Sequence, residues 1–453
     1  MELGIGLTKI IPPIVYLGGL VVIFLTLFYK IEIGIYFLVL ILPHRNLQFH
    51  LYQYPLGKDF IDLLFLVLII KWFTSRPKLV KDPKLRKPLG LIMVAIFSWT
   101  FFTLWIGSNY VNTGDLLSFD NPRFVFWKNF IMLPLLYLIM VNNVKDEKQI
   151  KIILILMTIS MLYMDRNFYS NFSGKNRESF NKDLRIEGTF SDLGSNPLAV
   201  FYAQNTIILL SIFFLDTDKK LKILFGVTIF FNYYCLMFLY SRGGYLATFV
   251  SLMFYGLIKD RRVLAILIVT LIFWQAFLPT SVRQRIEMTT SKEGDASIDD
   301  RFDMWGQAES LIAQNPILGY GFNITPYFNI RTGEKHRNSL HNGYLQLLLE
   351  QGAIGLLIFV IFFSLSIRYS WRLYRTAKEG FLKGFGLGFV GCVLAVLAGN
   401  IAGSYLFEML VSGYYWVQLA LIIRALEITN ESKIRSEAKI PATQVNGGSP
   451  WLT

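Results

Sequence analysis

Residues 301–357 read RFDMWGQAESLIAQNPILGYGFNITPYFNIRTGEKHRNSLHNGYLQLLLEQGAIGLL and join a polar, glycine-punctuated segment to a long apolar run. The polar part contains Arg301, Gly319, Gly321 and His341, whereas residues 342–357 include a single charged residue, Glu350. An apolar run of about 20 residues is long enough to cross a bilayer as a helix. This stretch therefore predicts polar chemistry beside a membrane-spanning helix.

The whole chain has the composition of a polytopic membrane protein. Its 453 residues are 54% hydrophobic and 17% charged, with a mean hydropathy of +0.46, whereas a soluble domain carries about 25% charged residues. Apolar runs give thirteen candidate spans, but the run 31–43 is short and adjoins the first, so it need not cross the membrane by itself. The sequence therefore predicts an all-α bundle of about 12–13 transmembrane helices. The candidate spans are 10–29, 31–43, 60–73, 89–107, 124–142, 149–164, 196–215, 221–240, 243–258, 263–278, 342–367, 383–406 and 411–426.

Basic residues set the expected orientation, because cytoplasmic loops are enriched in Lys and Arg. They cluster at 71–87, 145–151, 219–222, 259–262 and 368–383, which alternate along the predicted spans. The expected organisation is N-terminal transmembrane helices (1–164), an external loop (165–195), further helices (196–278), a large external, periplasmic loop (279–340), C-terminal helices (341–427) and a disordered cytoplasmic tail (428–453).

The same pattern excludes several classes of function. The net charge of +13 is mostly explained by the Lys and Arg residues of the predicted cytoplasmic loops. No soluble basic domain is apparent, so a nucleic-acid partner is not expected. Cys235 and Cys392 fall inside apolar runs and are expected to pack there rather than form a disulfide. The sequence has no Cys/His metal spacing, and the first apolar run reads as a retained span rather than a cleaved signal peptide.

Three polar segments are predicted on the external face: 185–196, the turn at Arg242, and the loop that ends at His341. Arg242 interrupts two apolar runs, which places it at the membrane boundary, where an arginine is costly unless it is paired or functional. It is either an interfacial arginine whose side chain reaches the lipid headgroups or a phosphate ligand.

A helix on the membrane surface is expected within the long loop. An N-cap pattern begins at Ser297, apolar residues recur at helical spacing from Ile298 to Ile312, and Asn315-Pro316 ends the helix. Arg301 lies in the first turn, where a helix N-terminus and a guanidinium together form a good anion site. The alternative is an ion pair of Arg301 with a neighbouring aspartate or a lipid headgroup.

His341 stands at the entry to the next span and is followed by Asn342, a candidate supporting residue. A histidine can exchange a proton near neutral pH and so serve as a general base, although a helix-capping or buried, hydrogen-bonded histidine is the alternative. His336 lies five residues earlier, which is the wrong spacing for a metal pair on one helix face. Asp303 and Glu309 are rival bases that fit a solvated helix face better.

Taken in order, these segments resemble the O-antigen ligase family of bacterial membrane enzymes, in detail over about residues 185–360 and in hydropathy throughout. The markers are Arg185 with Gly188-Thr189-Phe190, Asn196-Pro197, Ser241-Arg242-Gly243, Arg301 with Trp305, Asn315-Pro316, Gly319, Gly321, His341-Asn342, Gly352 and Gly355.

The resemblance implies a metal- and cofactor-independent glycosyltransferase of the bacterial inner membrane. Its donor would be a polyprenyl-pyrophosphate-linked glycan, and its acceptor would be a lipid core or another glycan. Membrane lipids would surround the protein. Arg242, Arg301 and Arg185 would hold the pyrophosphate, while His341 orients or deprotonates the acceptor hydroxyl. Fixed arginines would stabilise the negative charge that grows on the leaving pyrophosphate, and direct displacement would invert the anomeric centre.

Alternatives stay open at this point. O-antigen ligase-type transfer is the leading hypothesis for this chain, and polymerase-type elongation of lipid-linked repeats would use the same donor. A lipid-linked glycan transporter would also be polytopic, but it would carry ionisable residues in mid-span and broken helices in paired halves. A non-catalytic scaffold would tolerate the loss of His341.

Overall fold

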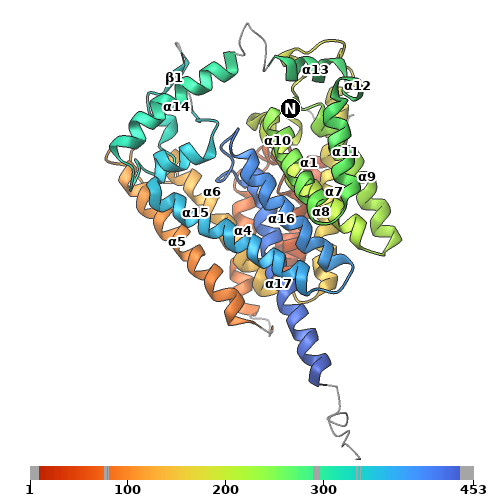
Figure 1. The fold of residues 1–453 in the computed structure, drawn as a ribbon. Coiled ribbons are helices and arrows are strands. Elements are labelled where there is room, and N and C mark those ends of the chain that lie inside the picture. The colour runs from red at the N-terminus through yellow and green to blue at the C-terminus, as the bar shows by residue number, and fades with distance from the viewer. Residues whose placement is uncertain are drawn as a thin grey trace, which may run out of the picture.

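Apolar runs form helices in lipid because every backbone polar group must be hydrogen-bonded within the protein. The computed structural model of this protein describes residues 10–75, 79, 81–288, 296–332, 335–336 and 338–438. Over these residues the fold is a helical bundle whose one small sheet pairs strand β1 (Arg331–Thr332) with β2 (Lys335–His336) (Figure 1). The predicted all-α bundle is confirmed, apart from this short hairpin.

A helix occupies each of the predicted spans. In chain order these are α1 (Ile11–Phe28), α2 (Ile31–Ile41), α4 (Phe60–Ser75), α5 (Pro83–Gly107), α6 (Pro122–Asn143), α7 (Glu147–Phe172), α8 (Ser195–Leu215), α9 (Lys219–Met237), α10 (Arg242–Ile258), α11 (Arg261–Ile272), α15 (Gly343–Thr376), α16 (Phe381–Gly399) and α17 (Met409–Ala438). Among the described residues, nine helices are long and apolar enough to cross a membrane, and α2, α4, α10 and α11 are the shorter ones.

Short elements join these helices at one end of the bundle. They are α3 (Arg45–Leu51), η1 (Lys182–Leu184), η2 (Gly188–Leu193), α12 (Trp274–Phe277), α13 (Thr280–Glu287), α14 (Ala296–Gln314) and η3 (Thr325–Tyr327). We call this the loop end, and the opposite end, where the Lys- and Arg-rich connections lie, the basic end. Figure 1 shows α13 and α14 at the loop end and the C-terminal part of α17 projecting from the basic end.

The centre of the bundle is built on close contact between α8 and α16. A Cβ added to Gly384 or Gly388 of α16 would lie 2.8 Å from the Cα of Ile212 or 2.7 Å from that of Ile208, both on α8. Small residues permit this approach, which is the usual way in which membrane helices pack. The two helices form a rigid support for the segments at their loop ends.

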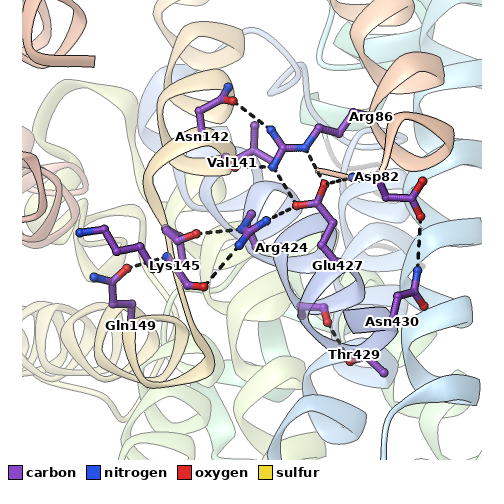
Figure 2. A network of polar contacts seen from close by, with 12 residues as sticks. Asp82, Arg86, Val141, Asn142, Lys145, Gln149, Arg424, Glu427, Thr429 and Asn430 are labelled. Atoms are coloured by element: carbon purple, nitrogen blue, oxygen red, sulfur yellow. Dashed lines mark hydrogen bonds and ion pairs between the residues drawn. The ribbon is translucent and has the colours of Figure 1, made fainter. Parts of the chain in front are cut away.

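A buried ionic network ties the basic end together (Figure 2). The Glu427 carboxylate on α17 accepts hydrogen bonds from Nε of Arg86 at 2.6 Å, from Nη2 of Arg86 at 2.7 Å and from the backbone N–H of Asp82 at 3.0 Å. Arg424 also donates to Glu427, and its Nε donates to the carbonyl of Val144 at 2.8 Å. The network joins α5, α17 and the α6–α7 connection.

Two loop boundaries predicted from the sequence are wrong. The external loop 165–195 begins later, because α7 continues to Phe172 with Asp165 only 4% exposed inside the bundle. Asp165 and Asn167, whose polarity suggested a loop, therefore face the protein interior. The tail predicted as disordered from residue 428 starts as helix, since α17 runs to Ala438, and residues 439–453 lie outside the described chain.

Two predicted spans are shorter than expected. The span 263–278 breaks at Phe273, where α11 ends and the single-turn α12 begins, and α11 has no buried residue whose packing would continue it. The span 383–406 ends at Gly399, because residues 400–408 form a loop anchored by the Asn400 side chain, which accepts from the Tyr405 backbone N–H at 2.9 Å.

The glycine motif of the long loop serves close packing. Gly319 and Gly321 have positive φ, and a Cβ on Gly321 would lie 2.3 Å from the Cα of Gly107. The loop backbone pairs with α15 where that helix is interrupted at Gly352: Tyr320 N–H donates to the carbonyl of Leu349 at 2.9 Å and Gly321 N–H to that of Glu350 at 2.8 Å. These contacts fix the long loop to the bundle below the site.

Candidate functional site

A cavity of about 200 Å³ lies at the loop end and brings together residues far apart in the sequence. Its lining residues are Arg185, Asn196, Arg242, Gly243, Arg285, Asp300, Arg301, Met304, His341 and Ala402. The four principal site residues predicted from the sequence, three arginines and a histidine, are all among them. They come from the α7–α8 connection and from the starts of α10, α14 and α15.

Arg185 is held in place by the first turn of α8. Its Nε donates to Oγ of Ser195 at 3.0 Å and its Nη2 to Oδ1 of Asn196 at 2.8 Å. Burial, followed by the nearby charge of Arg285, lowers the pKa of Arg185 below its ordinary value, and Arg242 and Arg301 act in the same direction. All four arginines line the same cavity.

Arg242 occupies the first position of α10, and the residues before it are fixed. The Ser241 side chain caps the helix by accepting from the Gly244 N–H at 3.2 Å, and Tyr240 has a positive φ of 52°. The Tyr240 hydroxyl lies 3.0 Å from Oγ of Ser281 on α13. The turn therefore joins α9, α10 and α13. Arg242 lies at the N-terminus of α10, where the helix favours a bound anion.

His341 is constrained on both sides. It has a φ of 51°, its N–H donates to Oγ of Ser339 at 3.2 Å, and two residues later Gly343 N–H donates to the carbonyl of Asn400 at 2.8 Å. A non-glycine residue in this region costs about 1–3 kcal/mol and persists only where the surroundings enforce it. Such strain is common at functional sites, which adds weight to a role for His341.

Asn342 supports the site without lining the cavity. Its Oδ1 accepts from the backbone N–H groups of Tyr344 at 3.0 Å and Leu345 at 3.2 Å, so it is the N-cap of α15. A cap of this kind fixes where the helix begins. Asn342 therefore sets the position of His341 rather than touching a ligand in the cavity.

Arg301 lines the cavity from the sixth position of α14, in the second turn of the helix rather than the first turn predicted from the sequence. The Trp305 indole N–H donates to the carbonyl of Leu340 at 2.9 Å, which ties α14 to the residue before His341. The buried face of α14, with Met304 and Ala308, packs on apolar residues of the same loop and on α15. This face of α14 is therefore covered by protein.

Arg285 was not predicted from the sequence, and Asp300 was expected only as a possible ion-pair partner of Arg301. Arg285 is 8% exposed, lies on α13 and stacks on the Phe180 ring with its guanidinium carbon 5.2 Å from the ring centroid. The available signal was a short helix with apolar residues at Val282 and Ile286, on the same face as the arginine. Asp300 adds a single carboxylate to the four arginines and the histidine.

The rejected candidates lie elsewhere. Asp303 and Glu309 are exposed on α14 and do not line the cavity. Within the described residues no group of three or more His, Cys, Asp or Glu side chains is arranged to hold a metal ion. The free thiols of Cys235 and Cys392 are buried in α9 and α16.

The residues that line the cavity can bind an anion beside a side chain that can exchange a proton. Guanidinium groups bind phosphate oxygens through paired N–H donors, and their effect is stronger in a partly buried site than in water. His341 lines the same cavity.

Comparison with known proteins agrees with the resemblance. Residues 226–360 match the family model described as O-antigen ligase. No curated protein matches the chain. The matched segment includes Arg242, Arg285, Arg301 and His341, while Arg185 lies outside it yet lines the same cavity. Residues 226–360 therefore form an O-antigen ligase family domain, and the described residues of the chain include nine helices long and apolar enough to cross a membrane.

Proposed function

We propose that the protein transfers a glycan from a polyprenyl-pyrophosphate donor to an acceptor hydroxyl, in the manner of an O-antigen ligase. The observation that carries this proposal is the meeting of Arg185, Arg242, Arg301 and His341 in one cavity. The sugar-linked pyrophosphate diester carries two negative charges, which suits a site lined by several guanidiniums. A transporter would need no strained histidine beside such an anion site.

The proposed reaction is a direct displacement at the anomeric carbon. The acceptor oxygen forms a bond to this carbon as the bond from the carbon to the pyrophosphate oxygen breaks, and the acceptor proton passes to His341. The electron pair of the broken bond stays on the pyrophosphate, which gains negative charge. Arg242 and Arg301 stabilise this charge more strongly in the transition state than in the ground state. One displacement inverts the anomeric configuration, and the arginines supply the positive charge that the leaving group needs.

The proposed location is the periplasmic face of the bacterial inner membrane. Lys- and Arg-rich connections lie at the basic end of the bundle, and such connections face the cytoplasm. The cavity is formed at the opposite helix ends, by residues at the starts of α8, α10 and α15. A donor lipid that is already in the outer leaflet would reach this end of the bundle by moving sideways within that leaflet.

The test is glycan transfer by the purified protein in detergent, with a polyprenyl-pyrophosphate-linked oligosaccharide as donor. Separate reactions offer a lipid-core acceptor and a lipid-linked repeat, each with and without a chelator. We expect product on the lipid core at the same rate in both conditions, with inverted anomeric configuration. Lengthening of the lipid-linked repeat alone would establish a polymerase instead, and no product with a folded protein would refute the proposed transfer.

A further inference from the structure

Glu350 is a buried carboxylate that no step of the proposed reaction uses. It is 1% exposed and lies on α15, just before the interruption of that helix at Gly352. Its Oε2 accepts from the Asn323 backbone N–H at 3.0 Å, and its Oε1 accepts from Oγ1 of Thr325 at 2.6 Å and from Nε2 of Gln346 at 3.1 Å. A buried carboxylate needs such donors, and here they come from two directions.

The first direction is the long loop. The backbone N–H of Asn323 and the carbonyl of Phe322 belong to one peptide group, and this carbonyl accepts from Nη2 of Arg123 at 3.1 Å. Arg123 is fully buried in the first turn of α6. The peptide group is therefore held between a buried guanidinium and a buried carboxylate. We call Asn323 and Thr325 the loop arm of Glu350, because they anchor the long loop to the bundle.

The second direction leads to His341. Gln346 lies one helical turn before Glu350 on the same face of α15. Its Oε1 accepts from Oγ of Ser339 at 3.4 Å, and this Oγ in turn accepts from the His341 backbone N–H at 3.2 Å. Two side chains thus join the buried carboxylate to the backbone of His341, and we call Gln346 and Ser339 the histidine arm.

The carboxylate sets the direction of each hydrogen bond in the histidine arm. An ionised carboxylate only accepts hydrogen bonds, whereas an amide has a donor end and an acceptor end. Gln346 therefore turns its NH₂ group toward Glu350, which leaves its Oε1 facing Ser339. The Ser339 hydroxyl donates its one proton to this oxygen, so a lone pair of the hydroxyl accepts from the His341 N–H.

The backbone of His341 needs such support. Its φ of 51° lies in the left-handed region, which a histidine adopts only where its surroundings enforce it. On either side, the Leu340 carbonyl accepts from the Trp305 indole and the Gly343 N–H donates to the Asn400 carbonyl. The bond to Ser339 is made by the N–H of His341 itself, so it acts directly on this strained residue.

We propose that Glu350 is a positioning residue for His341: through the histidine arm it holds the backbone conformation that keeps the imidazole in the cavity. The inference rests on the proposed function, in which His341 receives the acceptor proton, and it adds how this side chain is aligned. Misplacement of a reacting group by about 1 Å can lower a rate by about 100-fold. A small shift of this backbone should therefore slow the reaction step rather than weaken binding of the donor.

The test is steady-state glycan transfer by purified, monodisperse Ser339→Ala and Gln346→Ala variants. We expect kcat to fall about 10- to 100-fold with an unchanged KM for the donor, because the histidine is displaced while the arginines are not. Ser339→Thr keeps the hydroxyl and should restore most of the rate. Thr325→Val is the matched control, because it removes a donor to the same carboxylate from the loop arm. It should lower the unfolding free energy and leave kcat near the wild-type value.

Two further measurements show whether the arm acts through the histidine. The rate lost to Ser339→Ala should disappear in a His341→Ala background, because effects that pass through one group are not additive. Hydrogen exchange of the 339–342 amides needs no activity, and we expect it to become faster in Gln346→Ala and in Glu350→Gln. The glutamine in Glu350→Gln can turn its own NH₂ group toward Gln346 and so reverse the arm.

The outcomes separate this inference from the proposed function. A wild-type kcat in folded Ser339→Ala or Gln346→Ala, or an equal loss of rate from Ser339→Ala with and without the His341 side chain, would overturn the positioning role and leave the transfer reaction standing. Unchanged amide exchange at 339–342 in Gln346→Ala and Glu350→Gln would do the same. Absence of transfer by the wild-type protein with either acceptor would overturn the proposed function instead.

Discussion

Replacing Glu427 by Gln should destabilise the protein strongly while leaving the chemistry of the cavity intact. The Glu427 side chain is 1% exposed, and its two partners Arg424 and Arg86 are 3% and 16% exposed. Glutamine keeps one acceptor oxygen but turns an NH₂ group toward a guanidinium, so at least one charge-assisted hydrogen bond is replaced by a donor facing a donor. The two buried arginines then lose the carboxylate that they share. Removing one partner of a buried ion pair costs about 3–5 kcal/mol, and we expect a loss of stability in this range.

The assay is equilibrium unfolding of the purified protein in mixed micelles, followed by tryptophan fluorescence. Glu379→Gln is the control, because Glu379, which pairs with Lys383, is 68% exposed in the turn before α16 and should not shift the unfolding transition. Transfer per folded molecule should be unchanged in Glu427→Gln, since the network lies at the basic end (Figure 2). A change in unfolding free energy below about 1 kcal/mol would refute the view that this network holds α5 and α17 together.

Three further changes test how the site is supported. Gly321→Ala places a Cβ 2.3 Å from the Cα of Gly107 at a φ of 122°, and it should cost about 2–4 kcal/mol in the same unfolding assay. Asn342→Ala removes the N-cap of α15 and should cost about 1 kcal/mol, with a transfer rate below that of the wild type because His341 loses its fixed position; an unchanged rate would contradict that reasoning. Arg185→Lys keeps the charge but cannot reach both Ser195 and Asn196, so the Kd for polyprenyl pyrophosphate, measured by titration, should rise about tenfold.

Hydropathy located the helices because lipid demands continuous apolar segments, and the predicted spans all contain helices. It failed where polar residues face the protein interior. Asp165 resembled the start of a loop, although it is buried inside α7. Composition alone does not distinguish a polar residue in a loop from one that faces a neighbouring helix.

The site was predictable where polar residues interrupt apolar runs. Arg242 and His341 stand at such interruptions, and both line the cavity. Arg285 was not predictable in this way, because its short helix carries no motif and its position depends on contacts with Phe180 and the Tyr240 turn. The close packing of Gly321 likewise depends on Gly107, more than 200 residues earlier in the chain.

The most direct test of the central claim is the single-turnover rate of glycan transfer by Arg242→Ala, compared with Arg262→Ala, an exposed arginine at the basic end. Removing a group that stabilises developing negative charge typically lowers the rate by about 100- to 1000-fold, and we expect a loss of this size for Arg242→Ala with none for Arg262→Ala. A correctly folded Arg242→Ala protein that transfers glycan at the wild-type rate would contradict the claim that this cavity holds the pyrophosphate during the reaction.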